Sequence, residues 1–364
     1  MPSTTTPPLE PYVPPPQTKE NLDWASLEAL DLSLLSQPGG KQALAKQVLS
    51  FINKNGFFYV TNHGLTTTQI TRQYAIAKAL FALPLAEKQK YTCDTASGDF
   101  RGYKPQSTGE KLSARDNDER YNIPKFTPEH ERPHPQVIRD HYEEIRAFSL
   151  HIHDNILLPL LRLLAYVLEL EDEDTLVNLH RYDQPGLEYL RYMIYHPRPA
   201  ADDAAGGNIW AKGHTDYNTL TFLFYQPVAG LQVLSPDGVW RYVRSEPDAI
   251  IVNIADALEY LSGGFLKSTV HRVVRPPGDQ VSGSRLGLIY FARPEASVAM
   301  RPLESPLVDR VGSRLEGKYV RALEGVTAEE WARARIAKDH RFRTGLVDQP
   351  EREIIAGVPQ QYYD

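Results

Sequence analysis

Apolar residues recur at helical spacing through the first half of the chain. In the run 40–56, aliphatic side chains stand three or four positions apart, which predicts an amphipathic helix ending at Gly56. The run 67–82 repeats this spacing. The longest helical pattern covers residues 135–170, where Pro159 is expected to kink or divide the helix because proline has no N–H to donate.

From residue 187 onward the pattern changes to short apolar runs that are typical of strands. These runs are rich in Val, Ile, Tyr and Thr and are separated by Gly, Pro, Asp and Ser. In order they are YLRYMIYHP, GHTDYNTLTFLFY, GLQVLSP, GVWRYV, AIIVNIA, STVHRVVRP and RLGLIYFARP. SPDG at 235–238 and SGG at 262–264 are expected to be hairpin turns. A series of strands without intervening helices favours a two-sheet jelly roll or barrel.

These patterns divide the chain into four regions and predict a mainly β fold with flanking helices. Residues 1–20 begin with seven prolines in sixteen positions, which favours an extended arm, and we expect this arm to be a loose tail. Residues 21–180 form a helical and mixed region, and residues 181–300 form the β core. Residues 301–364 are expected to form a C-terminal helical segment, with a capped helix at 327–340, and a tail that packs on the core.

Composition and charge exclude several classes of protein. Hydrophobic residues make up 41% and charged residues 24%, as in an ordinary globular protein. The net charge of −6 and the lack of clustered Lys and Arg argue against a nucleic-acid partner. The sequence has neither an apolar run of about 18 residues nor a signal-peptide pattern, so no membrane partner is expected. The single cysteine, Cys93, has no neighbouring histidine, and it favours a reducing, cytoplasmic location over a disulfide framework.

Candidate metal-binding chemistry is concentrated in the stretch GHTDYNTLTFLF. Its His214 and Asp216 stand two positions apart, so on a strand both side chains project from one face. His271 lies on a later strand that antiparallel pairing can return beside them. Two histidines and one carboxylate leave three positions of an octahedron open, which suits Fe(II) that binds a bidentate co-substrate and dioxygen together. A zinc hydrolase uses similar donors, but the sequence contains no H-E-x-x-H motif.

Arg285 stands fourteen residues after His271, in the apolar strand RLGLIYF. A planar guanidinium can hold a carboxylate through two parallel hydrogen bonds, so Arg285 is the candidate anchor for an anionic co-substrate.

Four other histidines are assigned to structural positions. His63 lies in the turn NHG, where Asn, His and Gly tolerate a left-handed conformation. His141, His151 and His153 lie in the long helical pattern at spacings of ten and two, which do not share a helix face well.

Taken together, the motifs resemble those of the isopenicillin N synthase-like Fe(II)/2-oxoglutarate-dependent oxygenases. GFFYVTNHG, RGYKP, HTDYNTLTFL, GLQV, NIADALEYLSGGFLKSTVHRVV and RLGLIYF stand in that family's order over most of residues 21–345. The resemblance implies a double-stranded β-helix core with His214, Asp216 and His271 as iron ligands, and with Arg285 on the distal carboxylate of 2-oxoglutarate. It also implies that dioxygen is consumed and that CO2 and succinate are released. A substrate C–H bond would be hydroxylated, or the reaction would end in desaturation, cyclisation or ring expansion.

Two departures from the family pattern concern the co-substrate. Family members commonly carry Arg-x-Ser on the arginine strand, but here the serine position is Gly287. Many relatives also place an Asn and a Tyr toward 2-oxoglutarate, where this chain has Ile194 and His196. We expect His196 to donate the replacement hydrogen bond to a carboxylate. The loss of one hydrogen bond otherwise weakens binding by about 1 kcal/mol.

The substrate pocket can be outlined from strand alternation. If Arg285 faces inward, so does Phe291, which matches a pocket position in relatives, and we expect Tyr192 to face inward with Ile194 and His196. The candidate substrate contacts are aromatic or cationic. They are Phe291, Tyr217, Tyr192, Arg191, Arg101 and Tyr103. Such a lining suits a small aromatic or partly apolar molecule. Asp256 and Arg272 are expected to orient the strands that carry the metal ligands.

Three functions remain open at this point. The first is a 2-oxoglutarate-dependent oxygenase that acts on a small specialised metabolite, and Arg285 distinguishes it. The second is an iron oxidase of the same fold that takes its electrons from the substrate or from ascorbate, and Gly287 keeps it open. The third is a non-catalytic small-molecule-binding relative, which the intact His-Asp-His set disfavours. The identity of the substrate and the oligomeric state do not follow from the sequence.

Overall fold

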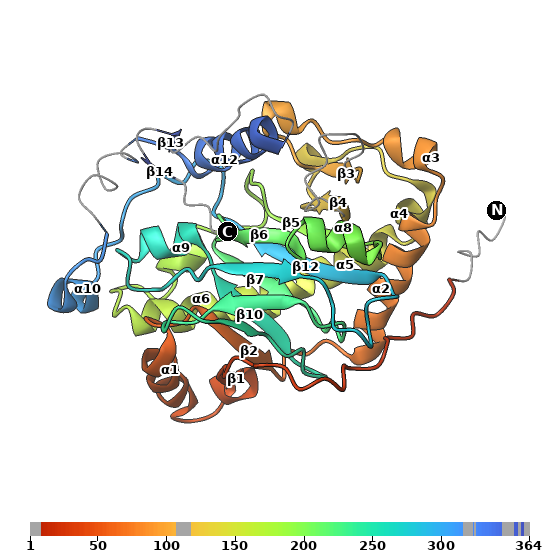
Figure 1. Cartoon of the computed structure of the whole chain (residues 1–364). Helices are drawn as coiled ribbons and strands as arrows, with labels where there is room; N and C mark the ends of the chain where they lie inside the picture. Colours follow the sequence, from red (N-terminus) through yellow and green to blue (C-terminus); the bar gives the residue numbers. More distant parts are fainter. Residues whose placement is uncertain are drawn as a thin grey trace.

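Two β-sheets face each other at the centre of the protein in the computed structural model (Figure 1). The structure describes residues 9–106, 118–315, 323, 325–343, 353–355 and 358–359, with side chains up to residue 338. The larger sheet runs in the order β1 (Ala29–Asp31), β2 (Phe57–Thr61), β10 (Ile250–Ile254), β7 (Leu220–Leu223), β12 (Arg285–Ala292), β5 (Tyr189–Tyr195), β4 (Asp118–Pro124) and β3 (Gly102–Lys104). The smaller sheet runs β6 (Ile209–His214), β11 (His271–Val274), β8 (Leu231–Leu234) and β9 (Trp240–Tyr242). A separate pair joins β13 (Glu353–Ile355) to β14 (Val358–Pro359).

The interior between the sheets is filled by alternate residues of their strands. Met193 and Tyr195 of the larger sheet pack on Trp210 and Val273 of the smaller one. All pairings are antiparallel within the two main sheets except that of β1 with β2. The predicted mainly β jelly-roll architecture is therefore confirmed. Successive side chains of each strand alternate between the space between the sheets and the outer face of its own sheet.

Helices cover the outer face of the larger sheet. They are α1 (Gly40–Phe51), α2 (Thr67–Phe81), α3 (Leu85–Gln89), α4 (Gln136–Asp140), α5 (Tyr142–Ile152), α6 (Leu158–Val167) and α7 (Thr175–Asn178). Short 3-10 turns lie at Leu32–Ser36, Thr95–Ser97 and Pro128–His130. The largest apolar cluster joins residues of α1, α2, α5 and α6 to Leu286, Leu288 and Tyr290, the outward-facing residues of β12. The predicted helices at 40–56 and 67–82 correspond to α1 and α2.

The long pattern at 135–170 is divided, as expected near Pro159. A π-helical turn at His153–Leu157 separates α5 from α6, and Pro159 lies in the first turn of α6. The missing N–H of proline costs no hydrogen bond in a first helical turn. A second break at His141 separates α4 from α5.

The β series contains helices that its sequence pattern did not reveal. The six-residue helices α8 (Ala200–Ala205) and α9 (Asp256–Leu261) interrupt the strands. The prediction of a hairpin at SGG was therefore wrong. Gly263 and Gly264, at φ of 61° and 79°, instead follow α9, because glycine adopts the left-handed conformation that ends a helix. The SPDG turn between β8 and β9 is confirmed.

Among the described residues, two further helices follow the β core. They are α10 (Pro306–Val311) and α12 (Ala328–Arg343), which lies on the opposite side of the molecule from α1 in Figure 1. The capping box predicted for the later helix is present. The Thr327 hydroxyl accepts from the Glu330 N–H, and the Glu330 carboxylate accepts from the Thr327 N–H.

The described part of the proline-rich arm, residues 9–20, is extended but not loose, so that expectation was wrong. The Tyr12 ring stacks on Tyr74 of α2 with centroids 4.9 Å apart. Gln17 donates to the Ser245 carbonyl oxygen at 2.8 Å. Residues 9–20 thus lie along the surface of the core, because apolar and aromatic side chains of this segment pack against its main apolar cluster.

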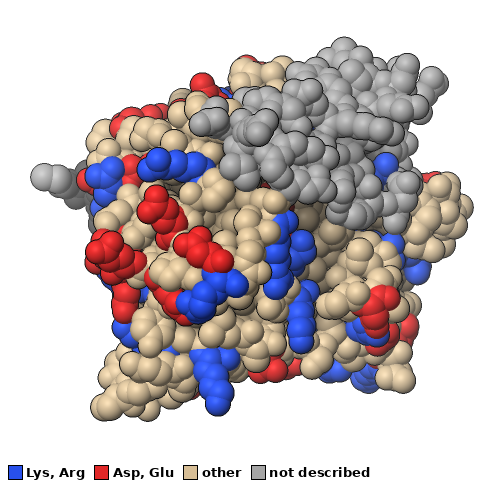
Figure 2. All heavy atoms as spheres, turned by 90° about the vertical axis from the view of Figure 1, so that its left-hand side faces the viewer, with Lys and Arg blue, Asp and Glu red and all other residues tan. Residues whose placement is uncertain are grey.

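The surface shows no concentration of one charge on the face in Figure 2, where acidic and basic side chains are both distributed over the described residues. Among the helices of the described residues, none is long and apolar enough to cross a membrane.

Candidate metal centre and active site

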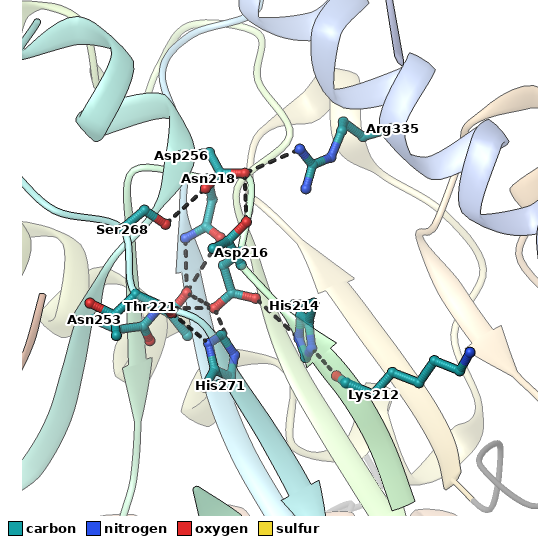
Figure 3. Close-up of polar contacts among 12 residues, drawn as sticks. Lys212, His214, Asp216, Asn218, Thr221, Asn253, Asp256, Ser268, His271 and Arg335 are labelled. Atoms are coloured by element: carbon teal, nitrogen blue, oxygen red, sulfur yellow. Dashed lines mark hydrogen bonds and ion pairs between the residues drawn. The ribbon is translucent and has the colours of Figure 1, made fainter. Parts of the chain in front are cut away.

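Two histidines and an aspartate converge where the smaller sheet ends (Figure 3). His214 is the last residue of β6 and His271 the first of β11, and the pairing of these strands places them directly opposite each other. The sequence suggested that Asp216 lies on the same strand as His214, but it lies two residues beyond the end of β6. The loop turns its carboxylate back toward both imidazoles, and all three ligand atoms lie within 4.8 Å of one another.

The two imidazole rings are oriented for metal binding through the same nitrogen. Nδ1 of His214 donates to the Lys212 carbonyl oxygen at 2.7 Å, and Nδ1 of His271 to that of Thr269 at 3.3 Å. Since a carbonyl can only accept, Nδ1 carries the proton and Nε2 keeps its lone pair. Both Nε2 atoms face Asp216, at 3.9 Å from His214 and 3.8 Å from His271. This donor set fits a divalent transition metal.

The carboxylate of Asp216 is held by its own hydrogen bonds. Oδ2 accepts from the Thr221 hydroxyl at 2.7 Å and from the Asn253 amide at 3.1 Å. Burial acts to raise the pKa of Asp216, but His271, His214 and these two hydrogen bonds outweigh it, so the pKa is lowered. The ligand is therefore kept as a carboxylate.

The open side of the triad is the side of His214. Its side chain is 42% exposed, whereas those of His271 and Asp216 are 10% and 12% exposed. Further ligands of a metal held here have access from this side.

Asp256 braces the metal-binding loop, as expected. Its backbone N–H donates to the Asp216 carbonyl oxygen at 2.9 Å, and its carboxylate accepts from Thr215, Ser268 and Arg335 of α12. The C-terminal helix is thereby tied to the loop that carries a metal ligand.

Arg272 follows His271 on β11 and is held by neighbouring strands of the smaller sheet. It donates to Gln232 at 2.8 Å, and its guanidinium lies 4.2 Å from the centroid of the Trp240 ring. This fits the expected orienting role.

Arg285 enters the interior from the larger sheet, at the start of β12. Only 5% of the residue is exposed, and its Nε donates to the Val228 carbonyl oxygen at 3.1 Å. Burial lowers its pKa. Among the described residues no carboxylate lies within ion-pair distance, and the charges that act on its pKa are those of the phenols of Tyr195, Tyr74 and Tyr12. A buried cation without a counter-ion is costly, so the site fits a ligand that brings a carboxylate.

The predicted facing of β5 was wrong by one residue. Arg285 pairs with Tyr195, so Tyr195 shares the inner face with it, and Met193 lies two residues along on that face. Ile194 and His196 therefore point the other way. A side chain at Gly287 would meet only Met193, at 3.7 Å, so the space beside this glycine remains open.

The outward face of β5 carries structural contacts. His196 donates from Nε2 to Glu119 at 2.8 Å, and the same buried carboxylate accepts from Lys88 and Tyr103. Tyr192 donates to Gln73 of α2 at 2.7 Å, so it lies among the helices and not in the pocket. A one-residue shift of register moves every side chain to the other face, which is how these predictions failed together.

Of the six candidate substrate contacts, the structure brings three together. Phe291 and Tyr217 pack in one aromatic cluster with residues of α12, and the Arg191 guanidinium lies 4.7 Å from the centroid of the Phe291 ring. We call this cluster the aromatic chamber. Tyr103 and Tyr192 are committed to the outer contacts described above, and Arg101 is paired with Asp99 at 2.8 Å.

Sequence reasoning missed several residues of this chamber, three of which supply a ring or a charge. They are Tyr189, Phe100 and Arg293. Continuing the β12 alternation past Phe291 would have indicated Arg293.

Comparison with known proteins agrees with this geometry. Residues 27–143 match the family model described as non-haem dioxygenase in morphine synthesis N-terminal, and residues 182–294 match the 2OG-Fe(II) oxygenase superfamily. The chain belongs to the 2OG-Fe(II) oxygenase superfamily and is a non-haem Fe(II)/2-oxoglutarate dioxygenase. Its family uses Fe(II), 2-oxoglutarate and dioxygen, and the His-Asp-His set is present in this chain.

For several relatives, the match to this chain extends over most of the relative's own length. UPF0676 protein C1494.01 of Schizosaccharomyces pombe is 32% identical over 80% of this chain and 87% of its own. Leucoanthocyanidin dioxygenase 2 of Oryza sativa subsp. japonica is 30% identical over 81% of this chain and 79% of its own. Among solved structures, a full-length Neurospora crassa protein in complex with alpha-KG and thymine shares the fold with a TM-score of 0.73 at 24% identity, covering 87% of this chain and 98% of that one.

Proposed function

We propose that this dioxygenase oxidises an unactivated C–H bond of a small specialised metabolite, by hydroxylation or by desaturation, cyclisation or ring expansion. His214, Asp216 and His271 would hold Fe(II), and Arg285 would bind the distal carboxylate of 2-oxoglutarate. The observation that carries this proposal is the convergence of two deprotonated Nε2 atoms on one carboxylate, with a buried cation that has no carboxylate partner among the described residues.

Fe(II) bound with 2-oxoglutarate and dioxygen supplies the oxidising chemistry that releases succinate and CO2 and removes hydrogen from carbon. The protein's own part is to hold and orient. The carbonyls of Lys212 and Thr269 fix the two imidazoles, and Thr221 fixes the carboxylate of Asp216. Such hydrogen bonds to metal ligands set ligand orientation and basicity.

The substrate would lie in the chamber of Tyr189, Tyr217 and Phe291. The rings of Tyr189 and Phe291 stack with centroids 4.8 Å apart, and Tyr217 directly follows the metal ligand Asp216. Aromatic walls of this kind favour an aromatic or partly apolar molecule. Tyr195 takes the place that His196 was expected to have beside the co-substrate, because it lies on the Arg285 face.

Succinate formation tests this proposal. The Fe(II)-loaded protein is incubated under air with and without 2-oxoglutarate and candidate metabolites. We expect succinate only with 2-oxoglutarate, and we expect His214→Ala to abolish it because one of three ligands is lost. His151→Ala is a matched control, since the ring nitrogens of this histidine bond to the His63 carbonyl oxygen and to Asn155, outside the site. Unchanged turnover in His214→Ala would contradict the proposal.

The same assay tests the alternative, an iron oxidase that does not use 2-oxoglutarate. The open space at Gly287 is the observation that supports this alternative. Substrate oxidation that persists without 2-oxoglutarate would favour it over our proposal.

A further inference from the structure

A second group of cations, the buried Arg293 and the half-buried Arg191, lies in the aromatic chamber, at the other end of β12 from Arg285. Arg293 is only 5% exposed, and its Nε has no hydrogen-bond partner among the described residues. Its guanidinium lies 4.4 Å from the centroid of the Tyr217 ring, 5.2 Å from Phe100 and 5.5 Å from Tyr189. An unpartnered N–H in a buried site costs about 1–3 kcal/mol unless a ligand accepts from it.

Arg191 of β5 brings a second positive charge to the same rings. Its guanidinium lies 5.2 Å from the Tyr189 centroid and 4.7 Å from that of Phe291. Its hydrogen bonds go to neutral groups, the Asn122 amide oxygen at 2.8 Å and the Tyr189 hydroxyl at 3.1 Å. Burial lowers its pKa.

No carboxylate of the described residues lies within ion-pair distance of Arg191 or Arg293. Glu329, at the edge of a small cavity that Arg293 also lines, is instead paired with Arg333 at 2.7 Å. Two guanidinium groups around one tyrosine ring repel each other in a medium of low dielectric constant. The Tyr189 hydroxyl lies against both guanidinium groups, and an anion bound beside it would remove this repulsion and accept from the free Nε of Arg293.

This pair of cations is separate from the anchor of the co-substrate. Arg293 and Arg285 are eight positions apart on one strand and its continuation. At about 3.3 Å per residue this is roughly 26 Å, which is too far for one small dicarboxylate to contact both. Arg293 instead lies over the ring of Tyr217, the residue that follows the metal ligand Asp216 in the chain.

We infer that Arg293 and Arg191 form the anchor for an anionic group of the organic substrate, a carboxylate or a phosphate, whose aromatic or apolar body packs on Tyr189, Phe291 and Tyr217. This inference rests on the proposed function and makes it more specific. The substrate class is a small aromatic acid, held by its anionic end so that a C–H bond of its body faces the metal.

Probe binding without turnover tests this inference. The full-length protein, loaded with Fe(II) and 2-oxoglutarate without dioxygen, is titrated by calorimetry with 3-phenylpropionate, its neutral amide and benzyl phosphate. Charge-assisted hydrogen bonds predict that at least one anion binds about 10- to 100-fold more tightly than the amide. The anion that is preferred identifies the head group.

Variants assign the preference to residues. Arg293→Met is expected to reduce the anion-to-amide ratio to near one, and Arg293→Lys to keep most of it, because the charge remains. Arg244→Met is the matched control, since Arg244 also lies over an aromatic ring, 4.3 Å from the centroid of Trp24, but outside the chamber. Circular dichroism and melting temperature show whether each variant folds, and Arg191→Met provides a second test should Arg293→Met not fold.

The inference is overturned if the wild-type protein binds no probe or binds the amide as well as both anions. It is also overturned if the preference survives in Arg293→Met and in Arg191→Met. The proposed function fails independently of these results. A protein that forms no succinate but prefers the anions contradicts only the proposed function, and one that forms succinate but ignores probe charge contradicts only this inference.

Discussion

Replacing Arg285 with methionine is expected to separate co-substrate binding from stability. The guanidinium is buried at 5% exposure and has no carboxylate partner among the described residues, so its removal relieves the cost of an uncompensated charge. Against this, the Val228 carbonyl oxygen loses the hydrogen bond from Nε at 3.1 Å, which costs about 1–3 kcal/mol. These two effects oppose each other, so the free energy of unfolding without ligands should change little.

Affinity for 2-oxoglutarate should change much more. Removing one partner of a buried, hydrogen-bonded ion pair costs about 2–5 kcal/mol. At about 1.4 kcal/mol per tenfold, the dissociation constant should rise by roughly 30- to 4000-fold. The effect should be confined to the distal carboxylate, because the 2-oxo acid end of the ligand is bound elsewhere.

A ligand without that carboxylate makes the test specific. Anaerobic calorimetry of the Fe(II)-loaded protein compares 2-oxoglutarate with 2-oxobutyrate in the wild type, in Arg285→Met and in the surface control Arg241→Met. The wild type and the control should strongly prefer 2-oxoglutarate, and Arg285→Met should bind both ligands about equally. If Arg285→Met still prefers 2-oxoglutarate by the wild-type ratio, Arg285 is not the anchor.

Three further predictions concern the groups around the site. Thr221→Val removes the hydrogen bond to Asp216 and should weaken Fe(II) binding about 10-fold in a metal titration; an unchanged affinity would contradict the orienting role. Burial acts to raise the pKa of Glu119, but hydrogen bonds from His196, Lys88 and Tyr103 lower it to about 2 from the ordinary 4.5. The lowered pKa stabilises the folded protein above pH 4.5, and this stabilisation is lost as the pH falls toward 2. Glu119→Gln should therefore lower the free energy of unfolding by about 3 kcal/mol at pH 7 in urea denaturation, with a much smaller difference near pH 2. Tyr12→Ala should raise the KM for 2-oxoglutarate several-fold with little change in kcat, because this ring packs near Arg285, and an unchanged KM would show that the arm does not affect the pocket.

The candidate metal ligands and the arginine on β12 were accessible from the sequence because they stand in short, dense motifs. The spacing of His214 and Asp216 and the strand character of STVHRVV and RLGLIYF were enough to expect a common site. Local pattern also predicted most strands, and the capping box before α12, since each depends on residues close together in the chain.

The sequence could not predict in the same way which side chains of β5 face inward. A strand that is buried on both sides reads as a nearly continuous apolar run, so YLRYMIYHP gives no polar side from which to set the alternation. The pairing of Tyr195 with Arg285 sets which side chains of β5 face inward, and it places His196 and Tyr192 outside the pocket.

The sequence by itself determined the chemistry that we propose for this protein, namely which donors would bind the metal and which cation would meet the co-substrate, because residue type and short spacing decide these. The tertiary structure decided which of the candidate substrate contacts come together in the chamber, and it added Arg293 to them. Arg191, Tyr217 and Arg293 come from different segments, and only the packing of the two sheets against α12 places their rings and charges together. Contacts of this kind depend on register and sheet packing, which involve residues far apart in the chain.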